Sequence, residues 1–96
     1  MTKSYRDLLR EARAAVREVT PAEAELAAAA GATLVDVREA SEWEQGHVSG
    51  ARQLSKSYLE QDIVALAPDH AVPIVLYCAG GIRSLFAGQT LVDMGY

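Results

Sequence analysis

Apolar residues recur every three or four positions over the first part of the chain, which is the spacing of one face of a helix. Residues 5–16 are therefore predicted to form an amphipathic helix, with Ser4 as its N-cap. Residues 20–23, Thr-Pro-Ala-Glu, form a capping box with proline at the first helical position. They predict a second, alanine-rich helix that ends at Gly31.

After Gly31, short apolar runs alternate with helical segments. Strands or extended pieces are expected at residues 33–37, 50–54 and 73–77, and helices or helical turns at 41–45, 57–66 and 84–94. Ser57 is expected to open the second of these helices in a capping box, and Ser84 to cap the third. This alternation favours an α/β domain with a parallel sheet flanked by helices, in which functional residues lie at the carboxyl ends of the strands.

Length, composition and charge narrow the classes of function. The chain has 96 residues, half of them hydrophobic, and a net charge of −4, which suits one small globular domain and argues against nucleic acid or an anionic membrane as a partner. No apolar run reaches the length of a membrane span, and the N-terminus lacks the apolar core of a secretory signal. The single cysteine has no internal disulfide partner, so a reduced, cytoplasmic location is expected.

That cysteine, Cys78, lies where the strand at 73–77 ends and the next helix begins. It is followed by Ala79, Gly80, Gly81, Ile82, Arg83 and Ser84. The two glycines let the backbone turn several N–H groups toward one point, and the start of the helix adds further unpaired donors. Such a place stabilises a thiolate, which is the nucleophile in sulfur chemistry, and the Ser84 hydroxyl is a further candidate to bond the sulfur.

Three segments resemble the signatures of the rhodanese family, the single-domain sulfurtransferases. They are residues 34–38 with 42–43, residues 46–51, and residues 78–84. The second segment departs from the family pattern at Ser49, where proline is usual. The three segments occur in the family's order, and the resemblance spans residues 17–96.

The resemblance implies a reaction for this loop. Cys78 would attack the outer sulfur of a donor such as thiosulfate, become a persulfide, and pass that sulfur to an acceptor by ping-pong kinetics. The donor would be a small sulfur anion, the acceptor a thiol, cyanide or a sulfur-carrier protein, and no metal or organic cofactor would be required. Arg83 would organise the loop or meet the donor's anion, and the amides of residues 79–84 would form the anion pocket.

Two other functions stay open at this point. A cysteine phosphatase or arsenate reductase of related fold would use the same nucleophile, but the phosphatases place five residues between cysteine and arginine, whereas Cys78 and Arg83 have four between them. The shorter loop favours a sulfur atom over a tetrahedral phosphate. A regulatory or sulfur-carrier binding module would keep the fold without turnover, and the intact cysteine and arginine argue against it.

Other polar residues are expected to support the loop. Asp36 and Arg38 are interpreted as a structural ion pair, because a carboxylate facing the sulfur would repel an anionic donor, although Arg38 could also orient that donor. Glu42 is expected to pair with a nearby loop or arginine, and Trp43 to lie in the core. His47 is weighed as a general base, but amides activate the cysteine in this family. No His, Cys or Asp cluster has metal-ligand spacing.

The two ends of the chain depart from the resemblance. Residues 1–16 precede it and are expected as an N-terminal helical extension, while the family pattern makes residues 17–19 a short first strand. The family normally continues beyond Gly95-Tyr96 with a strand inside the sheet, between the first strand and the one leading to Cys78, and then a final helix. Residues 17–96 are therefore expected to form a C-terminally incomplete rhodanese-like domain, with unpaired strand edges or with a strand exchanged with another chain.

Overall fold

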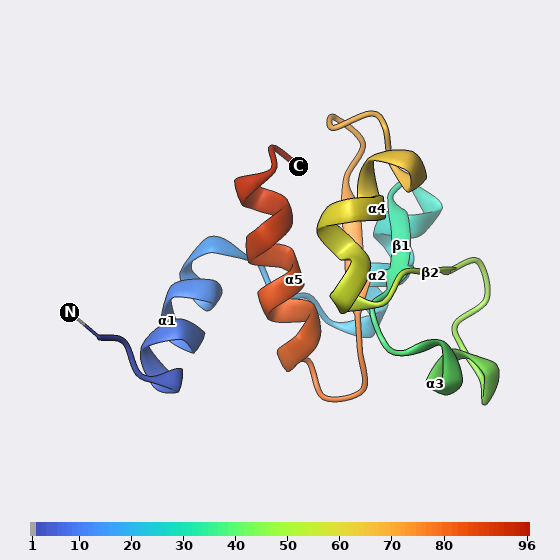
Figure 1. Cartoon of the computed structure of the whole chain (residues 1–96). Helices are drawn as coiled ribbons and strands as arrows, with labels where there is room; N and C mark the ends of the chain where they lie inside the picture. Colours follow the sequence, from blue (N-terminus) through green and yellow to red (C-terminus); the bar gives the residue numbers. More distant parts are fainter. Residues whose placement is uncertain (1) are drawn as a thin grey trace.

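The computed structural model describes residues 2–96 (Figure 1). Its elements, in chain order, are α1 (Tyr5–Ala15), α2 (Pro21–Ala29), β1 (Thr33–Asp36), α3 (Ala40–Glu44), β2 (Arg52–Gln53), the 3-10 turn η1 (Lys56–Tyr58), α4 (Leu59–Leu66), β3 (Ile74–Tyr77) and α5 (Ile82–Asp93). None of the helices in this part of the chain combines the length and the apolarity needed to cross a bilayer.

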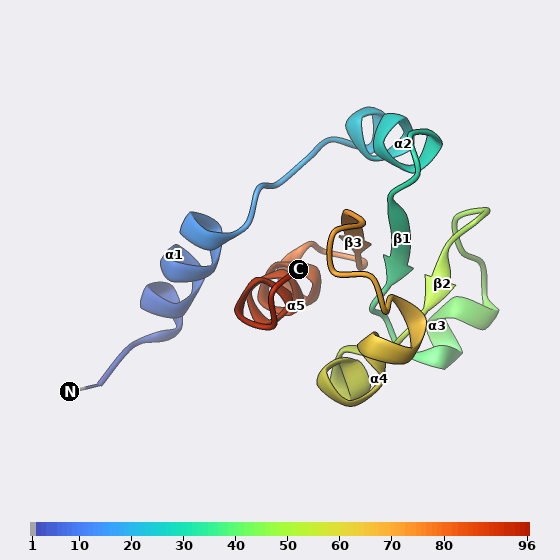
Figure 2. The ribbon, with the colours of Figure 1, turned by 90° about the horizontal axis from the view of Figure 1, so that it is seen from above.

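The sheet has three parallel strands in the order β2-β1-β3. On one side β1 pairs with β3 from Thr33 opposite Ile74 to Asp36 opposite Tyr77, and on the other it pairs with β2. Helix α2 covers one face of the sheet, and α4 and α5 cover the other (Figure 2). This arrangement confirms the predicted α/β class, and it brings the carboxyl ends of β1 and β3 together.

The core lies between the sheet and the pair α4 and α5. Val35 and Val37 alternate along the chain at β1, so both point to this face, and both are fully buried. Leu59 and Ile63 stand one helical turn apart on α4 and are also fully buried against them. Ala87 and Leu91 of α5 belong to the same cluster, so this packing holds α5, which follows the Cys78 loop, against the sheet.

Helix α1 packs against α5 rather than against the sheet (Figure 1). It begins with the expected capping box, in which Ser4 and Asp7 each bond the other's backbone N–H. A Cβ atom at Gly88 of α5 would lie 3.0 Å from the side chain of Val16, so glycine is what allows the chain after α1 to approach α5 this closely. The helix predicted over residues 5–16 is confirmed.

The segment of residues 17–19, expected as a first strand, is not a strand. The backbone is extended on either side of it, with φ −121° and ψ 132° at Val16 and φ −76° and ψ 161° at Thr20. In residues 2–96 the sheet ends at β3, so these residues have no neighbouring strand with which to form a ladder. Extended conformation without a hydrogen-bonded partner does not make a strand.

Two helix starts also differ from expectation. Ser57 lies inside the turn η1 and caps nothing, because α4 begins only at Leu59, with Tyr58 in the N-cap position. Helix α5 begins at Ile82, two residues earlier than expected, because Gly81 takes the N-cap position with a φ of +88° that glycine adopts readily. Ser84 therefore lies in the first turn of α5 and not at its cap.

Candidate active site

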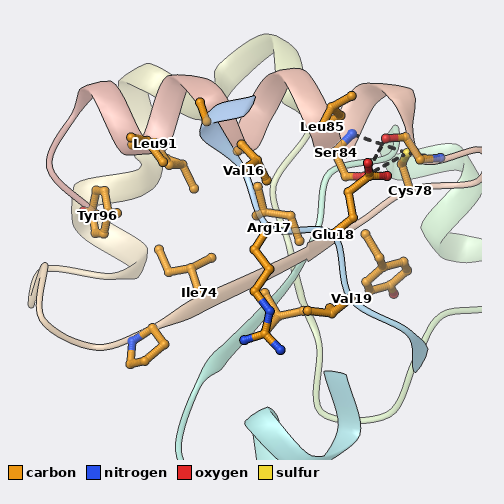
Figure 3. A pocket seen from close by; sticks show the side chains of 18 of the residues that line it. Val16, Arg17, Glu18, Val19, Ile74, Cys78, Ser84, Leu85, Leu91 and Tyr96 are labelled. Atoms are coloured by element: carbon orange, nitrogen blue, oxygen red, sulfur yellow. Dashed lines mark hydrogen bonds between the residues drawn. The ribbon is translucent and has the colours of Figure 1, made fainter. Parts of the chain in front are cut away.

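Cys78 follows directly on β3, and α5 begins four residues later. The intervening loop turns back at Gly81, so that the first N–H groups of α5 point toward the sulfur (Figure 3). Ala79, Gly80 and Gly81 are exposed, whereas Cys78, Ile82 and Ser84 are half-buried. The thiol is thus reachable from solvent at one rim of the site and enclosed by backbone at the other.

Several donors converge on the sulfur of Cys78. The N–H of Gly81 lies 3.0 Å from Sγ and the N–H of Ser84 lies 3.4 Å from it. The Cys78 S–H donates to the Ser84 oxygen at 3.4 Å, while the Ser84 hydroxyl donates to the Gly81 carbonyl at 3.1 Å. Burial raises the pKa of the thiol, but the hydrogen bonds from Ser84, Gly81 and Gly80 outweigh it, so the pKa lies below its usual range.

Arg83 does not bond the sulfur. Its guanidinium forms two parallel hydrogen bonds with the carboxylate of Glu42 on α3, at 2.6 and 3.0 Å. The side-chain hydrogen bond with Arg83, followed by that from the Glu39 backbone, lowers the pKa of Glu42 to about 2. The pair ties the Cys78 loop to α3, and the expected partnership of Glu42 with an arginine is confirmed.

A second bidentate pair lies at the end of β1. Arg38 donates from Nε and Nη2 to the carboxylate of Asp36 at 2.7 to 3.0 Å, and its backbone N–H donates to the same group at 2.9 Å. Asp36 is fully buried, and Arg38 also donates to the carbonyl of Gly46 at 2.8 Å. Burial raises the pKa of Asp36, but these hydrogen bonds from Arg38 outweigh it and lower the pKa overall. The expected structural ion pair is confirmed.

Tyr77, the last residue of β3, is a site residue that the sequence analysis missed. Its hydroxyl accepts a hydrogen bond from the N–H of Val48 at 3.1 Å, and Tyr77 lies near enough to Asp36 to help lower the pKa of that carboxyl. The guanidinium of Arg38 lies 5.7 Å from the centre of its ring. Its place directly before Cys78 was the only feature of the sequence that could have marked Tyr77 as a site residue, because its partners lie far away along the chain.

His47 and Trp43 stand apart from the sulfur. The two rings are stacked, with centroids 3.3 Å apart, and His47 Nδ1 lies 3.0 Å from the Trp43 carbonyl. Trp43 was expected in the core but is only half-buried. The ring stacked on its face is that of His47, which is itself exposed to solvent. No hydrogen bond joins His47 to Cys78 among the described residues, so the geometry supports the reading in which amides activate the thiol.

Across residues 2–96, no group of three or more His, Cys, Asp or Glu side chains is arranged to hold a metal ion. The site therefore consists of a thiol, a set of backbone donors, a hydroxyl and two bidentate ion pairs. This combination stabilises a negative charge on one sulfur atom, or a small anion bound beside it.

Replacing Ser84 with alanine should raise the pKa of the Cys78 thiol, because the variant lacks the hydroxyl that can turn from the Gly81 carbonyl to donate to the sulfur once the thiol is ionised. The rate of alkylation by iodoacetamide, measured against pH, should move its midpoint upward and fall several-fold at pH 7. Ser57→Ala removes an exposed hydroxyl in η1 and provides the matched control. An alkylation profile in Ser84→Ala that coincides with the unsubstituted protein would contradict this account of the thiol.

Comparisons with known proteins agree with this geometry. A family model described as a rhodanese-like domain matches residues 20–96. An uncharacterized protein of Bacillus subtilis, YqhL, is 45% identical over 64 residues, which are 67% of this chain and 49% of that protein. The thiosulfate sulfurtransferase GlpE of Stutzerimonas stutzeri is 34% identical over 80 residues, covering 83% of this chain and 72% of that protein. The chain thus spans about half the length of the first relative and about three quarters of the second.

Two solved structures extend the likeness to the fold. A Rhodopseudomonas palustris protein of unknown function, described as a possible tyrosine phosphatase, superposes with a TM-score of 0.79 at 30% identity, over 99% of this chain and 80% of that one. An Escherichia coli rhodanese solved with anions superposes with a TM-score of 0.66, also at 30% identity, over 69% of this chain and 78% of that one.

Proposed function

The chain belongs to the family of rhodanese-like domains, and on this premise we propose that it is a sulfurtransferase that carries sulfane sulfur as a persulfide on Cys78. The observation that supports the proposal most directly is the position of the Gly81 N–H, 3.0 Å from the sulfur and at the start of a twelve-residue helix. A sulfur atom held there in the anionic state is a nucleophile at neutral pH.

The proposed reaction has two displacements. In the first, the Cys78 thiolate attacks the outer sulfur of thiosulfate, the sulfur–sulfur bond of thiosulfate breaks, and sulfite leaves with the bonding electrons. In the second, a thiol, cyanide or a sulfur-carrier protein attacks the terminal sulfur of the persulfide, and the Cys78 thiolate leaves unchanged. The backbone donors that hold the free thiolate can hold the terminal sulfur in the intermediate state, and neither displacement uses a metal or an organic cofactor.

Arg83 has a positioning role in this proposal. Its two hydrogen bonds to Glu42 fix the base of the Cys78 loop to α3, while its charge stays close enough to Cys78 for the two to interact electrostatically. Asp36 and Arg38 hold the neighbouring loop that carries Gly46, so they shape the rim of the site without touching the sulfur.

Phosphatase activity fits the geometry of this site less well than sulfur transfer does. A tetrahedral phosphate needs a wide ring of donors closed by a free guanidinium. Here four residues separate Cys78 from Arg83, and the edge of the guanidinium formed by Nη1 and Nη2 is directed to Glu42 and away from the sulfur. The description of the R. palustris protein as a possible tyrosine phosphatase therefore does not carry over to this chain.

Two steady-state assays test the proposal. Thiocyanate should form from thiosulfate and cyanide with parallel double-reciprocal lines, because a ping-pong mechanism releases the first product before the second substrate binds. An aryl phosphate should release no phosphate above the rate without protein. Phosphate release without thiocyanate formation would replace the proposed activity with phosphoryl transfer.

A further inference from the structure

Two residues on either side of Cys78 hold the same distant segment of the chain. Tyr77, directly before Cys78, accepts a hydrogen bond at its hydroxyl from the N–H of Val48 at 3.1 Å. Arg83, at the start of α5, holds the carboxylate of Glu42 through two hydrogen bonds. The segment between these two partners is therefore fixed at both of its ends against the part of the chain that carries the thiol.

The end that Tyr77 holds is the loop of residues 46–51, which has little structure of its own. Within the loop, the backbone hydrogen bond that the structure shows runs from the Ala51 N–H to the Val48 carbonyl at 3.1 Å. Ser49 stands where proline is usual in the rhodanese family, so no ring fixes the backbone there, and residues 46–50 are all exposed. A loop of this kind takes its position from the contacts that hold it from outside.

Two further contacts hold this loop, and both come from residues that lie close to it in the sequence. Arg38 donates to the carbonyl of Gly46 at 2.8 Å, and Nδ1 of His47 lies 3.0 Å from the carbonyl of Trp43. Tyr77 differs from them because it belongs to β3, the strand that leads to the thiol. Of these three contacts, only the hydrogen bond to Tyr77 fixes the loop relative to that strand.

We propose that Tyr77 is a positioning residue, whose hydroxyl holds the loop of residues 46–51 as a preformed wall beside Cys78 against which the sulfur donor binds. Val48 and Ser49 line the same hollow as Tyr77 and Cys78, which places this loop at the site. A wall that is already in place lowers the entropic cost of binding, because the donor does not have to order it. The proposal deepens the proposed function, on which its catalytic consequence rests.

Hydrogen exchange tests the position of the loop without reference to sulfur transfer. Tyr77→Phe removes the hydroxyl and keeps the ring, so the contact with the Arg38 guanidinium remains. The Val48 amide, which loses its acceptor, and the Ala51 amide, which reports on the turn within the loop, should both exchange at least about fivefold faster. Tyr58→Phe, which removes the hydroxyl of an exposed tyrosine, should change neither rate. Unchanged exchange at both amides in Tyr77→Phe would overturn the proposal.

Steady-state kinetics separates a positioning role from a direct effect on the sulfur. In Tyr77→Phe the KM for thiosulfate should rise several-fold while kcat stays within about twofold, because the backbone donors around Cys78 are unaltered. For the same reason, the pH midpoint of alkylation by iodoacetamide should stay where it is in the unsubstituted protein. A fall in kcat at unchanged KM, or a shifted midpoint, would overturn the proposal, because Tyr77 would then act on the thiol.

A second substitution distinguishes positioning of the loop from a general loss of stability. Ser49→Pro restricts the loop backbone by another route, and the Ser49 N–H makes no hydrogen bond to residues 2–96 that proline would remove. Added to Tyr77→Phe, it should restore the KM for thiosulfate and slow exchange at Ala51, while the Val48 amide, still without an acceptor, stays fast. A KM that stays raised after exchange at Ala51 has slowed would contradict the role of the loop. If both amides respond to Tyr77→Phe but the unsubstituted protein forms no thiocyanate, the loop is held as proposed and only the proposed function fails.

Discussion

Replacing Cys78 with serine is expected to abolish sulfur transfer, with a fall in thiocyanate formation of at least about a thousandfold. The hydroxyl of serine is not ionised by hydrogen bonds that suffice for a thiol, and it forms no persulfide. Intact mass after treatment with thiosulfate is the direct measurement: the unsubstituted protein should gain about 32 Da, cyanide should remove the gain, and Cys78→Ser should show none.

A matched control distinguishes the effect of the Cys78 loop from the effect of having a thiol anywhere in the protein. The double substitution Cys78→Ser with Ser57→Cys moves the single thiol to an exposed position in η1, where no ring of amides surrounds it. We expect this protein to stay inactive and unmodified by thiosulfate. Equal mass gain in Cys78→Ser, or equal activity in the double variant, would show that the nucleophile is assigned wrongly.

The largest effect on stability is expected from Arg38→Ala. This change leaves the fully buried Asp36 carboxylate without the guanidinium that neutralises it. Removing one partner of a buried ion pair typically costs about 3–5 kcal/mol, a large share of the roughly 5–15 kcal/mol that stabilise a domain. Urea unfolding at pH 7 measures the loss. Arg13→Ala, in an exposed pair with Glu18, should change the free energy of unfolding by less than about 1 kcal/mol.

The pH dependence of the free energy of unfolding provides a second, independent test of this role of Arg38. In the unsubstituted protein the pKa of Asp36 is lowered, so the pair contributes stability above the unfolded pKa of about 3.9 and loses it as pH falls through the folded pKa. In Arg38→Ala burial dominates and the pKa of Asp36 rises above that of the unfolded state. The difference in stability between the two proteins should therefore shrink as pH falls from neutrality toward acid. A constant difference, or a loss below about 1 kcal/mol, would contradict the assigned role of the pair.

Local patterns in the sequence predicted much of the fold and the backbone arrangement around Cys78. The spacing of apolar residues and two capping boxes located α1 and α2, and the apolar runs located β1 and β3 to within one residue. The position of Cys78 between a strand and a helix, followed by two glycines, was enough to predict amides converging on the sulfur. These features depend on neighbours within a few positions, which is the range over which sequence spacing acts directly.

The hydrogen bonds that join distant parts of the chain across the site could not be predicted from local sequence patterns. That Arg83 reaches Glu42, 41 positions away, and that Tyr77 reaches Val48, 29 positions away, depends on how β1, α3 and β3 are placed against one another. The early start of α5 followed from the positive φ of Gly81, and the stacking of Trp43 on His47 followed from an exposed turn.

By itself, then, the sequence determined the class of fold, the position of the Cys78 thiol and the backbone donors around it, because each is encoded in a contiguous stretch of chain. Only the tertiary structure decided that Arg83 is the arginine that pairs with Glu42, and that residues 17–19 lie extended without becoming a strand. The physical reason is that a strand, unlike a helix, takes its hydrogen bonds from another part of the chain or from another chain, and in residues 2–96 the place beside β3 has no strand in it.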